Sequence, residues 1–381
     1  MRIGILGGAF DPIHSGHIHA ARVAMASLNL DHVLMLPSGE PPYKRPHASR
    51  EDRMRMVELA CAGQDGLIPC DIEIMRPGRT YTVDTLRALR QSCPDDEMVY
   101  IIGSDAVDTL PQWRGIDEIE RCVTFAVLRR PGSKQPDIRA QIIPAEGLDI
   151  SSGMVRRLVA EGRDPGDLVP GEVKHYIRDR GLYLCDYTED EILEKLKRTI
   201  SLHRWHHTLG VADTAERLAA RFGVNPKKAR LAALLHDCAK SLPYGEMRKL
   251  VSENVPDTDE LELDAEPVLH APAGMVLASR DYGVRDPEIL QAIRRHTLGG
   301  DDMTAMDALI YVSDFIEPGR RTFPGLEQVR ALAESDIFAA MRLSAKLSSD
   351  YLFSRGKEPH PRTLALITQE AKRNDGTQGI G

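Results

Sequence analysis

The sequence predicts two folds in succession, an α/β fold up to about residue 186 and an all-α fold after it. In the first half, short apolar runs alternate with segments whose apolar residues recur at helical spacing. This alternation is typical of a mostly parallel sheet with helices on both faces. After Asp186 the strand-like runs cease, and helical patterns continue to about residue 372. A chain of 381 residues is long enough for two domains of ordinary size.

The periodicity also predicts the individual elements and the domain limits. In the first half we expect strands at 2–6, 32–36, 70–74, 98–102, 122–128 and 140–143, and helices at 17–28, 50–61, 83–91, 115–120, 152–161 and 171–179. In the second half we expect helices at 189–200, 203–222, 226–239, 244–252, 266–281, 286–296, 304–317, 325–334 and 336–354. The expected domains are residues 1–187 and 188–372, followed by a disordered tail at 373–381.

Composition narrows the class of protein. The chain is 42% hydrophobic and 28% charged, with a formal net charge of −8, which argues against a general nucleic-acid-coating role. None of the six cysteines falls in a C-x-x-C pair, so we expect reduced thiols. The N-terminus enters a strand at once, unlike a signal peptide, and no apolar run approaches the roughly 18 residues that span a bilayer. We therefore expect a cytoplasmic protein without nucleic-acid or membrane partners.

A glycine-bearing loop with two histidines organises the first half. It reads GGAFDPIHSGH from Gly7 to His17 and joins the first expected strand to the first expected helix. Carboxyl ends of parallel strands are where ligands bind in such sheets. A loop there presents backbone N–H groups and the positive end of a helix, which together hold phosphate. His14 and His17 would stand at that position. The loop differs from the G-x-x-x-x-G-K-[ST] and G-x-G-x-x-G phosphate loops, neither of which occurs here.

The loop matches G-G-x-F-D-P-x-H-x-G-H and resembles the signature of the nicotinamide/nicotinate mononucleotide adenylyltransferases, within the H-x-G-H nucleotidyltransferases. The resemblance implies a Rossmann-like nucleotidyltransferase domain. It also implies transfer of AMP from ATP to nicotinate mononucleotide, with nicotinate adenine dinucleotide and pyrophosphate as products and Mg²⁺ on the triphosphate. His14 and His17 would be catalytic. Since the acceptor phosphate is already an anion, catalysis requires mainly positioning and charge stabilisation.

Three further segments resemble motifs of the same family. Residues 149–156 (DISSGMVR) resemble its second ATP motif, I-S-S-T-x-I-R, with Gly153 in place of Thr. Residues 81–86 (YTVDTL) and 110–113 (LPQW) resemble Y-T-x-D-T-L and L-P-x-W. By this resemblance Tyr81, Thr82 and Trp113 would line a pyridine pocket, since a cationic ring favours aromatic faces. Another acceptor, such as phosphopantetheine, is the alternative within the superfamily, and these two segments argue against it.

The resemblance also implies a set of ATP-binding residues. The serines 151 and 152 would cap a helix, and the arginine at 156 on its first turns would reach the phosphates. Lys44, in a P-P-Y-K segment, would bridge phosphates or remain a solvated loop lysine. The full set is Gly7, Gly8, Phe10, Lys44, Asp105, Ser151, Ser152 and Arg156.

A second group of residues, centred on His236-Asp237, belongs to the helical half. With four further residues it follows the order H…HD…H…H…D, which resembles the HD superfamily of metal-dependent phosphohydrolases. The surrounding segments, including HTLGV from residue 207, resemble the subfamily that hydrolyses diadenosine tetraphosphate symmetrically to two ADP. The resemblance implies an all-α HD domain. Its metal ligands would be His207, His236, Asp237, His270, His296 and Asp314.

Four imidazoles and two carboxylates suffice for two metal ions, with Asp237 bridging them. This mixed ligation suits Fe, Mn, Co or Zn better than Ca²⁺. Asp237 and Lys240 would be catalytic. Lys240, one turn beyond His236, would contact substrate phosphate or remain a solvated lysine at a helix end.

Helix geometry selects among the early histidines. His207 shares an apolar stripe with Val211, Ala215, Leu218 and Phe222, whereas His206 lies on the polar side. His203, one turn before His207 on the same stripe, is the reserve candidate.

Together the two halves predict a bifunctional enzyme whose partners are ATP, nicotinate mononucleotide and diadenosine tetraphosphate. As alternatives, the HD half could be a nucleotide-binding regulatory module without turnover, act on another nucleotide phosphoester, or chiefly drive homo-oligomerisation.

Overall fold

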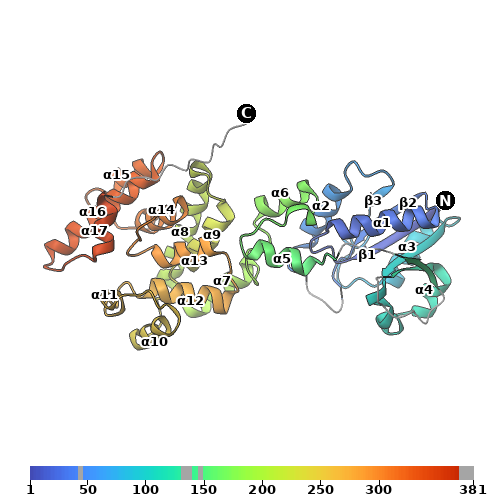
Figure 1. Cartoon of the computed structure of the whole chain (residues 1–381), viewed down its shortest axis with the longest axis horizontal. Coiled ribbons are helices and arrows are strands. Elements are labelled where there is room, and N and C mark those ends of the chain that lie inside the picture. The colour runs from blue at the N-terminus through green and yellow to red at the C-terminus, as the bar shows by residue number, and fades with distance from the viewer. Residues whose placement is uncertain (42–45, 130–139, 145–148, 369–381) are drawn as a thin grey trace. The chain divides into compact units, whose positions relative to one another are not determined.

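The computed structural model describes residues 1–41, 46–129, 140–144 and 149–368. The chain divides into two compact units (Figure 1). The first comprises Met1–Val159 and Arg163–Tyr183, and the second begins at Leu184 and also includes Ala160–Gly162. The expected α/β fold followed by an all-α fold is confirmed. The expected domain limits at residues 187–188 and 372 stay a prediction, and the tail at 373–381 lies outside the described residues.

The first half contains a parallel sheet interleaved with helices. Its elements are β1 (Arg2–Gly8), α1 (Ser15–Leu28), β2 (His32–Pro37), α2 (Arg50–Cys61), β3 (Leu67–Pro69), α3 (Thr82–Ser92), β4 (Glu97–Gly103), η1 (Ser104–Gln112), α4 (Ile116–Cys122), β5 (Thr124–Arg129), β6 (Ala140–Pro144), α5 (Ser152–Ala160), η2 (Gly166–Leu168) and α6 (Gly171–Arg180). The strand order is β3-β2-β1-β4-β5-β6, and every pairing is parallel. The order reverses at β1, so the carboxyl ends of β1 and β4 form the crevice where such sheets bind ligands.

Alternating side chains of the strands enter two separate cores. Leu6, Val99 and Ile101 face one core with residues of α1, α2, α5 and α6. Ile5 and Tyr100 face the other with residues of α3 and α4. Because successive side chains on a strand point to opposite faces, both faces of the sheet are covered, as expected from the apolar runs.

One expected strand, at 70–74, is wrong. The third strand is β3, and residues 72–74 form a turn that the backbone N–H of Met75 closes by donating to the carbonyl of Asp71 at 3.0 Å. The alternation of isoleucine with acidic residues imitates a half-buried strand. However, Glu73 is buried and accepts hydrogen bonds from the backbone of Gly39 at 3.3 Å and the hydroxyl of Thr85 at 2.8 Å. These bonds hold the segment in a turn.

The second half is helical throughout its described part (Figure 1, yellow to red). Its helices are α7 (Glu189–Thr199), α8 (Leu202–Ala219), η3 (Ala220–Phe222), α9 (Pro226–Leu235), α10 (Tyr244–Asn254), α11 (Glu260–Leu263), α12 (His270–Tyr282), α13 (Pro287–Arg295), α14 (Ala305–Ile316), α15 (Leu326–Ala333), α16 (Ile337–Ser354) and α17 (Pro361–Thr368). One core, formed by residues from Ile192 to Leu366, joins them.

Polar caps fix where several of these helices begin. Thr188 and Thr304 form capping boxes with residues three positions later, and Asn225 and Asp286 accept backbone hydrogen bonds before a proline at the first helical position. Two expected limits differ. The helix expected at 226–239 ends at Leu235, and the helix expected at 266–281 begins at His270.

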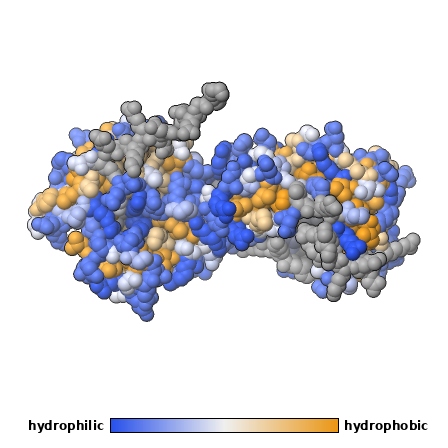
Figure 2. Space-filling view, in the orientation of Figure 1, coloured by the Kyte–Doolittle hydropathy of each residue, from blue (hydrophilic) through white to orange (hydrophobic). Residues whose placement is uncertain are grey.

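Figure 2 shows hydrophilic residues over most of the visible face of the helical half. Among the helices in the described ranges, none combines the length and apolar character required to cross a membrane.

Candidate active sites

The loop after β1 brings His14 and His17 together at the start of α1. Their rings stack with centroids 3.6 Å apart, and the backbone N–H of His14 donates to Nδ1 of His17 at 3.2 Å. Phe10 packs edge-on against His17 at 4.9 Å, with its own backbone in the left-handed region at φ 46°. Such a conformation is unusual for a non-glycine residue and is common near functional sites. The two imidazoles therefore lie at the positive end of a helix beside the crevice.

The helix α5 is tied to the same loop. The hydroxyl of Ser151 caps its first turn by accepting from the backbone of Met154 at 3.1 Å, and Ser152 donates to the carbonyl of Pro12 at 2.9 Å. Arg156 donates to the carbonyl of Asp11 and lies 3.7 Å from its carboxylate. Residues 140 or more positions apart thus converge on one loop. Lys44 lies outside the described residues, and so does the side chain of Asp105, which belongs to η1.

Asp11, which sequence reasoning did not single out, holds this loop. Its buried carboxylate accepts from the backbone N–H groups of His47 at 2.8 Å and Ala48 at 3.0 Å, and from the hydroxyl of Tyr183 at 3.0 Å. Burial alone would raise the pKa of Asp11, but these hydrogen bonds outweigh it and lower the pKa. Asp11 lies inside the recognised motif, whereas no local pattern marks Tyr183, 172 positions away.

The buried Arg53 is a second residue that sequence reasoning missed. It donates to the carbonyls of Ala9, Ser38 and Gly39, and thereby joins the loops that follow β1 and β2.

Tyr81 and Trp113 pack against the core on the other face of the sheet, which contains Tyr100. Trp113 packs edge-on against Tyr100 with centroids 5.9 Å apart, and Thr82 hydrogen-bonds with Tyr100. The guanidinium of Arg114 lies 4.7 Å from the ring centre of Tyr81. A methyl group at Gly7 would lie 2.5 Å from the Tyr100 hydroxyl, so the aromatic group adjoins the glycine loop.

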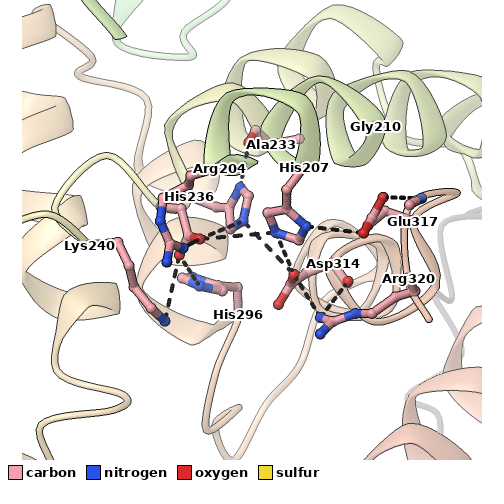
Figure 3. Close-up of polar contacts among 12 residues, drawn as sticks. Arg204, His207, Gly210, Ala233, His236, Lys240, His296, Asp314, Glu317 and Arg320 are labelled. Carbon is pink, nitrogen blue, oxygen red and sulfur yellow. Dashed lines mark hydrogen bonds and ion pairs between the residues drawn. The ribbon is translucent and has the colours of Figure 1, made fainter. Parts of the chain in front are cut away.

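In the helical half, four histidines lie around two carboxylates. Figure 3 shows three of them, His207, His236 and His296, together with Asp314. Nε2 of His207 lies 3.0 Å from Oδ1 of Asp314, and Nε2 of His270 lies 3.0 Å from Oδ1 of Asp237. Nε2 of His270 also lies 3.1 Å from Nε2 of His296. Two groups of ligand atoms lie close enough to hold a metal ion: His207, His236 and Asp314, and His236, Asp237 and His296.

The outward ring nitrogens of three histidines are held by backbone or carboxylate oxygens. Nδ1 of His236 contacts the carbonyl of Ala233 at 2.6 Å, Nδ1 of His296 contacts that of Ile293 at 2.7 Å, and Nδ1 of His207 lies 3.3 Å from Glu317. Metal-binding histidines are held in this way. Nε2 of His236 is buried and has no hydrogen-bond partner, although Asp237 lies 3.7 Å away. A lone pair so placed fits a metal ion.

Metal binding requires neutral imidazoles and ionised carboxylates, and the pKa shifts of His296 and Asp237 favour these forms. Burial and the neighbouring His236 and His270 lower the pKa of His296 to about 3. Burial would raise the pKa of Asp237, but His236 and His270 outweigh it and lower the pKa well below its ordinary value. At His207, in contrast, burial would lower the pKa, but Asp314 and Glu317 outweigh it, raise the pKa and favour the charged form.

Two expected details of this cluster need correction. His236 ends α9 as its capping residue, and Asp237 lies in the turn that follows rather than on a helix. This turn lets adjacent residues both face the cluster, which residues on a continuous helix would not do.

A cavity of about 480 Å³ opens onto the cluster. His203, the reserve candidate, lines this cavity. So does Lys240, whose Nζ lies 2.9 Å from Nδ1 of His270. Arg204 and Arg320 were missed by the sequence reasoning and pair with Asp237 and Asp314. The position of Arg204, one turn before His207, and the arginine shortly after Asp314 were the available signals.

Comparison with known proteins agrees with this division. The cytidylyltransferase-like family model matches residues 5–158, and the HD domain model matches residues 204–341. The Shouchella clausii protein named "Probable nicotinate-nucleotide adenylyltransferase" is 41% identical over 187 residues, which are 48% of this chain and 96% of that protein.

Two further similarities are to a relative that aligns with most of the chain and to a solved structure that aligns with about half of it. The Mycoplasma genitalium protein named "Probable nicotinate-nucleotide adenylyltransferase/Ap4A hydrolase" is 27% identical over 359 residues, 91% of this chain and 97% of that protein. The crystal structure of a "predicted HD superfamily hydrolase involved in NAD metabolism" from Clostridium acetobutylicum is 32% identical, with a TM-score of 0.46, and covers 48% of this chain and 95% of that one. The chain belongs to the nicotinate-nucleotide adenylyltransferase family through its N-terminal half, to which an HD domain is fused.

Proposed function

We propose that the N-terminal half transfers AMP from ATP to nicotinate mononucleotide, giving nicotinate adenine dinucleotide and pyrophosphate. The observation that carries this proposal is the stacked pair of His14 and His17 at the start of α1, beside the carboxyl end of β1. The name of the 41% identical relative supports it. In this proposal ATP contacts Gly7, Gly8, Phe10, Lys44, Asp105, Ser151, Ser152 and Arg156.

The residues would act by position and charge. The acceptor phosphate attacks the α-phosphorus of ATP, a P–O bond forms, and pyrophosphate leaves with the electrons of the broken P–O bond. His14, His17 and Arg156 would donate hydrogen bonds to oxygens on which negative charge accumulates. Trp113 and Tyr81 would face the pyridine ring of the acceptor. Mg²⁺ on the triphosphate would screen its charge.

We further propose that the HD half is a metal-dependent phosphohydrolase. The residues that would hold two ions of Fe, Mn, Co or Zn are His207, His236, Asp237, His270, His296 and Asp314. The unpartnered Nε2 of buried His236 and the mixed imidazole–carboxylate donor set fit such ions. When bound, ions of this kind polarise a phosphate and activate water. Lys240, at the cavity wall, would donate hydrogen bonds to a substrate phosphate.

For the substrate of the HD half we propose diadenosine tetraphosphate, cleaved symmetrically to two ADP. The name of the Mycoplasma genitalium relative, which the chain covers almost completely, supports this choice. A nucleotide-sensing module without turnover is the second candidate, because the cavity would bind nucleotide whether or not water attacks.

One experiment separates these possibilities. The full chain and its Asp237→Ala variant are analysed for bound metal, then incubated with ATP and each mononucleotide, and separately with diadenosine tetraphosphate. We expect the variant to lose metal and hydrolysis and to retain adenylyl transfer. Asp213→Ala, at an exposed aspartate on α8, is the matched control. Equal metal content in Asp237→Ala and the parent would refute the metal site, and metal binding without hydrolysis of any nucleotide would favour the sensing module.

A further inference from the structure

Two arginines form ion pairs with the two aspartates at the centre of the HD cluster. A guanidinium nitrogen of Arg204 pairs with Oδ2 of Asp237. Nη2 of Arg320 lies 3.2 Å from Oδ1 of Asp314 and donates to the carbonyl of the same residue at 2.8 Å. Figure 3 shows Arg204 on the side of Lys240 and Arg320 on the side of Glu317. The two arginines thus reach the cluster from opposite sides.

Both arginines lie at the boundary between the cluster and the cavity. Their side chains are 28% and 39% exposed, whereas that of Asp237 is 6% exposed. Both line the cavity of about 480 Å³. Each guanidinium can therefore swing toward the cavity and stay in contact with solvent, but the largely buried carboxylate that it leaves would need another cation in its place.

The arginines contact the same oxygens on which the histidine nitrogens converge. Oδ2 of Asp237 lies 3.7 Å from Nε2 of His236 and 4.0 Å from Nε2 of His207. Oδ1 of Asp314 lies 3.0 Å from Nε2 of His207. A metal ion held by these histidines would compete with each arginine for its carboxylate oxygen. The arginine nitrogen and the ion cannot both keep that position.

The charges balance without metal. Arg204 and Lys240 pair with Asp237, Arg320 pairs with Asp314, and Glu317 pairs with His207. With the imidazoles counted as neutral, the formal charges of these three carboxylates and three cations cancel. Two divalent ions would add four positive charges to the same volume. The loaded site would then attract a polyanion, and the displaced arginines would be free cations beside it.

We propose that Arg204 and Arg320 are exchangeable counterions, which leave Asp237 and Asp314 when metal binds and then hold phosphate groups on either side of the attacked phosphorus. This inference rests on the proposed metal-dependent hydrolysis. The planar guanidinium matches two phosphate oxygens at once. Because the arginines approach from opposite sides, the site selects a chain of phosphates over a single phosphate group. Arg204 and Arg320 therefore determine the specificity for a chain of phosphates. Before metal binds, they also balance the negative charges of Asp237 and Asp314.

The test uses the full chain, stripped of metal with a chelator and titrated with Mn²⁺, as parent and as Arg204→Gln and Arg320→Gln. The matched control is Arg217→Gln, at a 54% exposed arginine of α8 paired with Glu334. The first readout is Mn²⁺ affinity. The second is the affinity of the Mn²⁺-loaded protein for inorganic tripolyphosphate, by calorimetry at one fixed Mn²⁺ concentration so that chelation by the probe is common to all variants.

We expect each active-site variant to bind Mn²⁺ as tightly as the parent or more tightly, because a competing cation has been removed. We expect tripolyphosphate to bind each variant roughly tenfold more weakly, the loss of one charge-assisted pair. Inorganic phosphate, which cannot reach both arginines, should lose less. Arg320→Lys, which keeps the charge and loses the planar fork, should lie between parent and Arg320→Gln.

Three results would overturn the inference in different ways. If Mn²⁺ affinity falls in both variants while the loaded proteins bind tripolyphosphate like the parent, the arginines serve only to hold the carboxylates. If the parent fails to bind Mn²⁺, the proposed metal-dependent function fails together with this inference. A parent that binds Mn²⁺ and hydrolyses nucleotide, with variants unchanged in tripolyphosphate affinity, refutes the role of the arginines alone.

Discussion

Glu317 holds His207 through the ring nitrogen that faces away from the cluster. Oε1 of Glu317 lies 3.3 Å from Nδ1 of His207, and Oε2 accepts a hydrogen bond from the backbone of Gly319. Because Nδ1 is engaged, Nε2 of His207 is directed at Asp314, 3.0 Å away. Glu317 is buried and touches the proposed ligand rather than the cavity, so it acts as a positioning residue.

Glu317→Ala should weaken Mn²⁺ binding by roughly ten- to a hundredfold, the usual effect of removing a carboxylate that orients a metal-binding histidine. Metal titration of the full chain measures this. Glu327→Ala, at a 73% exposed glutamate on α15, should leave Mn²⁺ affinity unchanged. Unaltered affinity in Glu317→Ala would show that His207 is either not a ligand or is oriented without Glu317.

Gly210→Ala should also weaken Mn²⁺ binding, through the same carboxylate. A methyl group at Gly210 would lie 3.0 Å from Oε2 of Glu317 and would push it from its place. Alanine favours a helix interior over glycine by about 1 kcal/mol, so a purely local effect would stabilise α8. Gly245→Ala in α10, where a methyl group meets nothing within 4 Å, is the control. A more stable Gly210→Ala protein with parental Mn²⁺ affinity would contradict the prediction.

His17→Ala should reduce nicotinate adenine dinucleotide formation by roughly 10²–10³-fold, because it removes a proposed hydrogen-bond donor to the transferring phosphate. Chromatography of reactions with ATP and nicotinate mononucleotide measures the product. Hydrolysis of diadenosine tetraphosphate by the same protein should be unchanged. His175→Ala, at an exposed histidine of α6, controls for removal of an imidazole from this half. Retained synthesis in His17→Ala would contradict the proposed role of the loop in adenylyl transfer.

Gly7→Ala should destabilise the N-terminal half by about 1–3 kcal/mol, the usual cost of overpacking. The added methyl group would lie 2.5 Å from the hydroxyl of Tyr100, so the cost should be smaller in a Tyr100→Phe background. The chain has two tryptophans, so a Trp205→Phe background leaves Trp113 as the fluorescent reporter of this half during denaturation. Strictly additive effects of Gly7→Ala and Tyr100→Phe would show that the two residues do not meet.

The stability supplied by Asp11 should depend on pH. The pKa of Asp11 in the folded chain lies below the ordinary value of 3.8. As the pH falls through this range, the unfolded chain therefore binds more protons at Asp11 than the folded chain does. Asp11 therefore stabilises the fold fully above pH 3.8 and loses this contribution below it. In the Trp205→Phe background, the difference in unfolding free energy between parent and Asp11→Asn should be largest at pH 7 and shrink below pH 3.8. A constant difference over this range would contradict the role of Asp11.

Elements with a regular pattern were predictable from the sequence. Strands buried on both faces, such as β4, appear as continuous apolar runs, and the capped helices α7 and α14 begin within one residue of the expected position. The turn at Glu73 was not predictable, because its local alternation is that of a strand and only contacts with Gly39 and Thr85 decide otherwise. The short α11 and the terminal α17 were missed, since each offers few turns from which to recognise a period.

The site residues divide in the same way. Residues such as His14 and His236 could be identified from the sequence, because their residue type and spacing match known motifs. Residues that support the site through contacts distant in sequence could not be identified in this way. Tyr183 reaches Asp11 from 172 positions away, and Glu317 serves a histidine 110 positions before it, as a consequence of the fold alone.

The separate cores have an evolutionary consequence. Buried apolar residues from Ile192 onward pack in one cluster, and those up to Tyr183 pack in two others. Each half therefore has an interior of its own, although Ala160–Gly162 belongs to the second unit. Residues in the Shouchella clausii relative correspond to one half of this chain only, whereas those of the Mycoplasma genitalium relative correspond to both. Selection can thus act on the linkage of the two activities, through equal expression and shared inheritance, independently of how well each half folds.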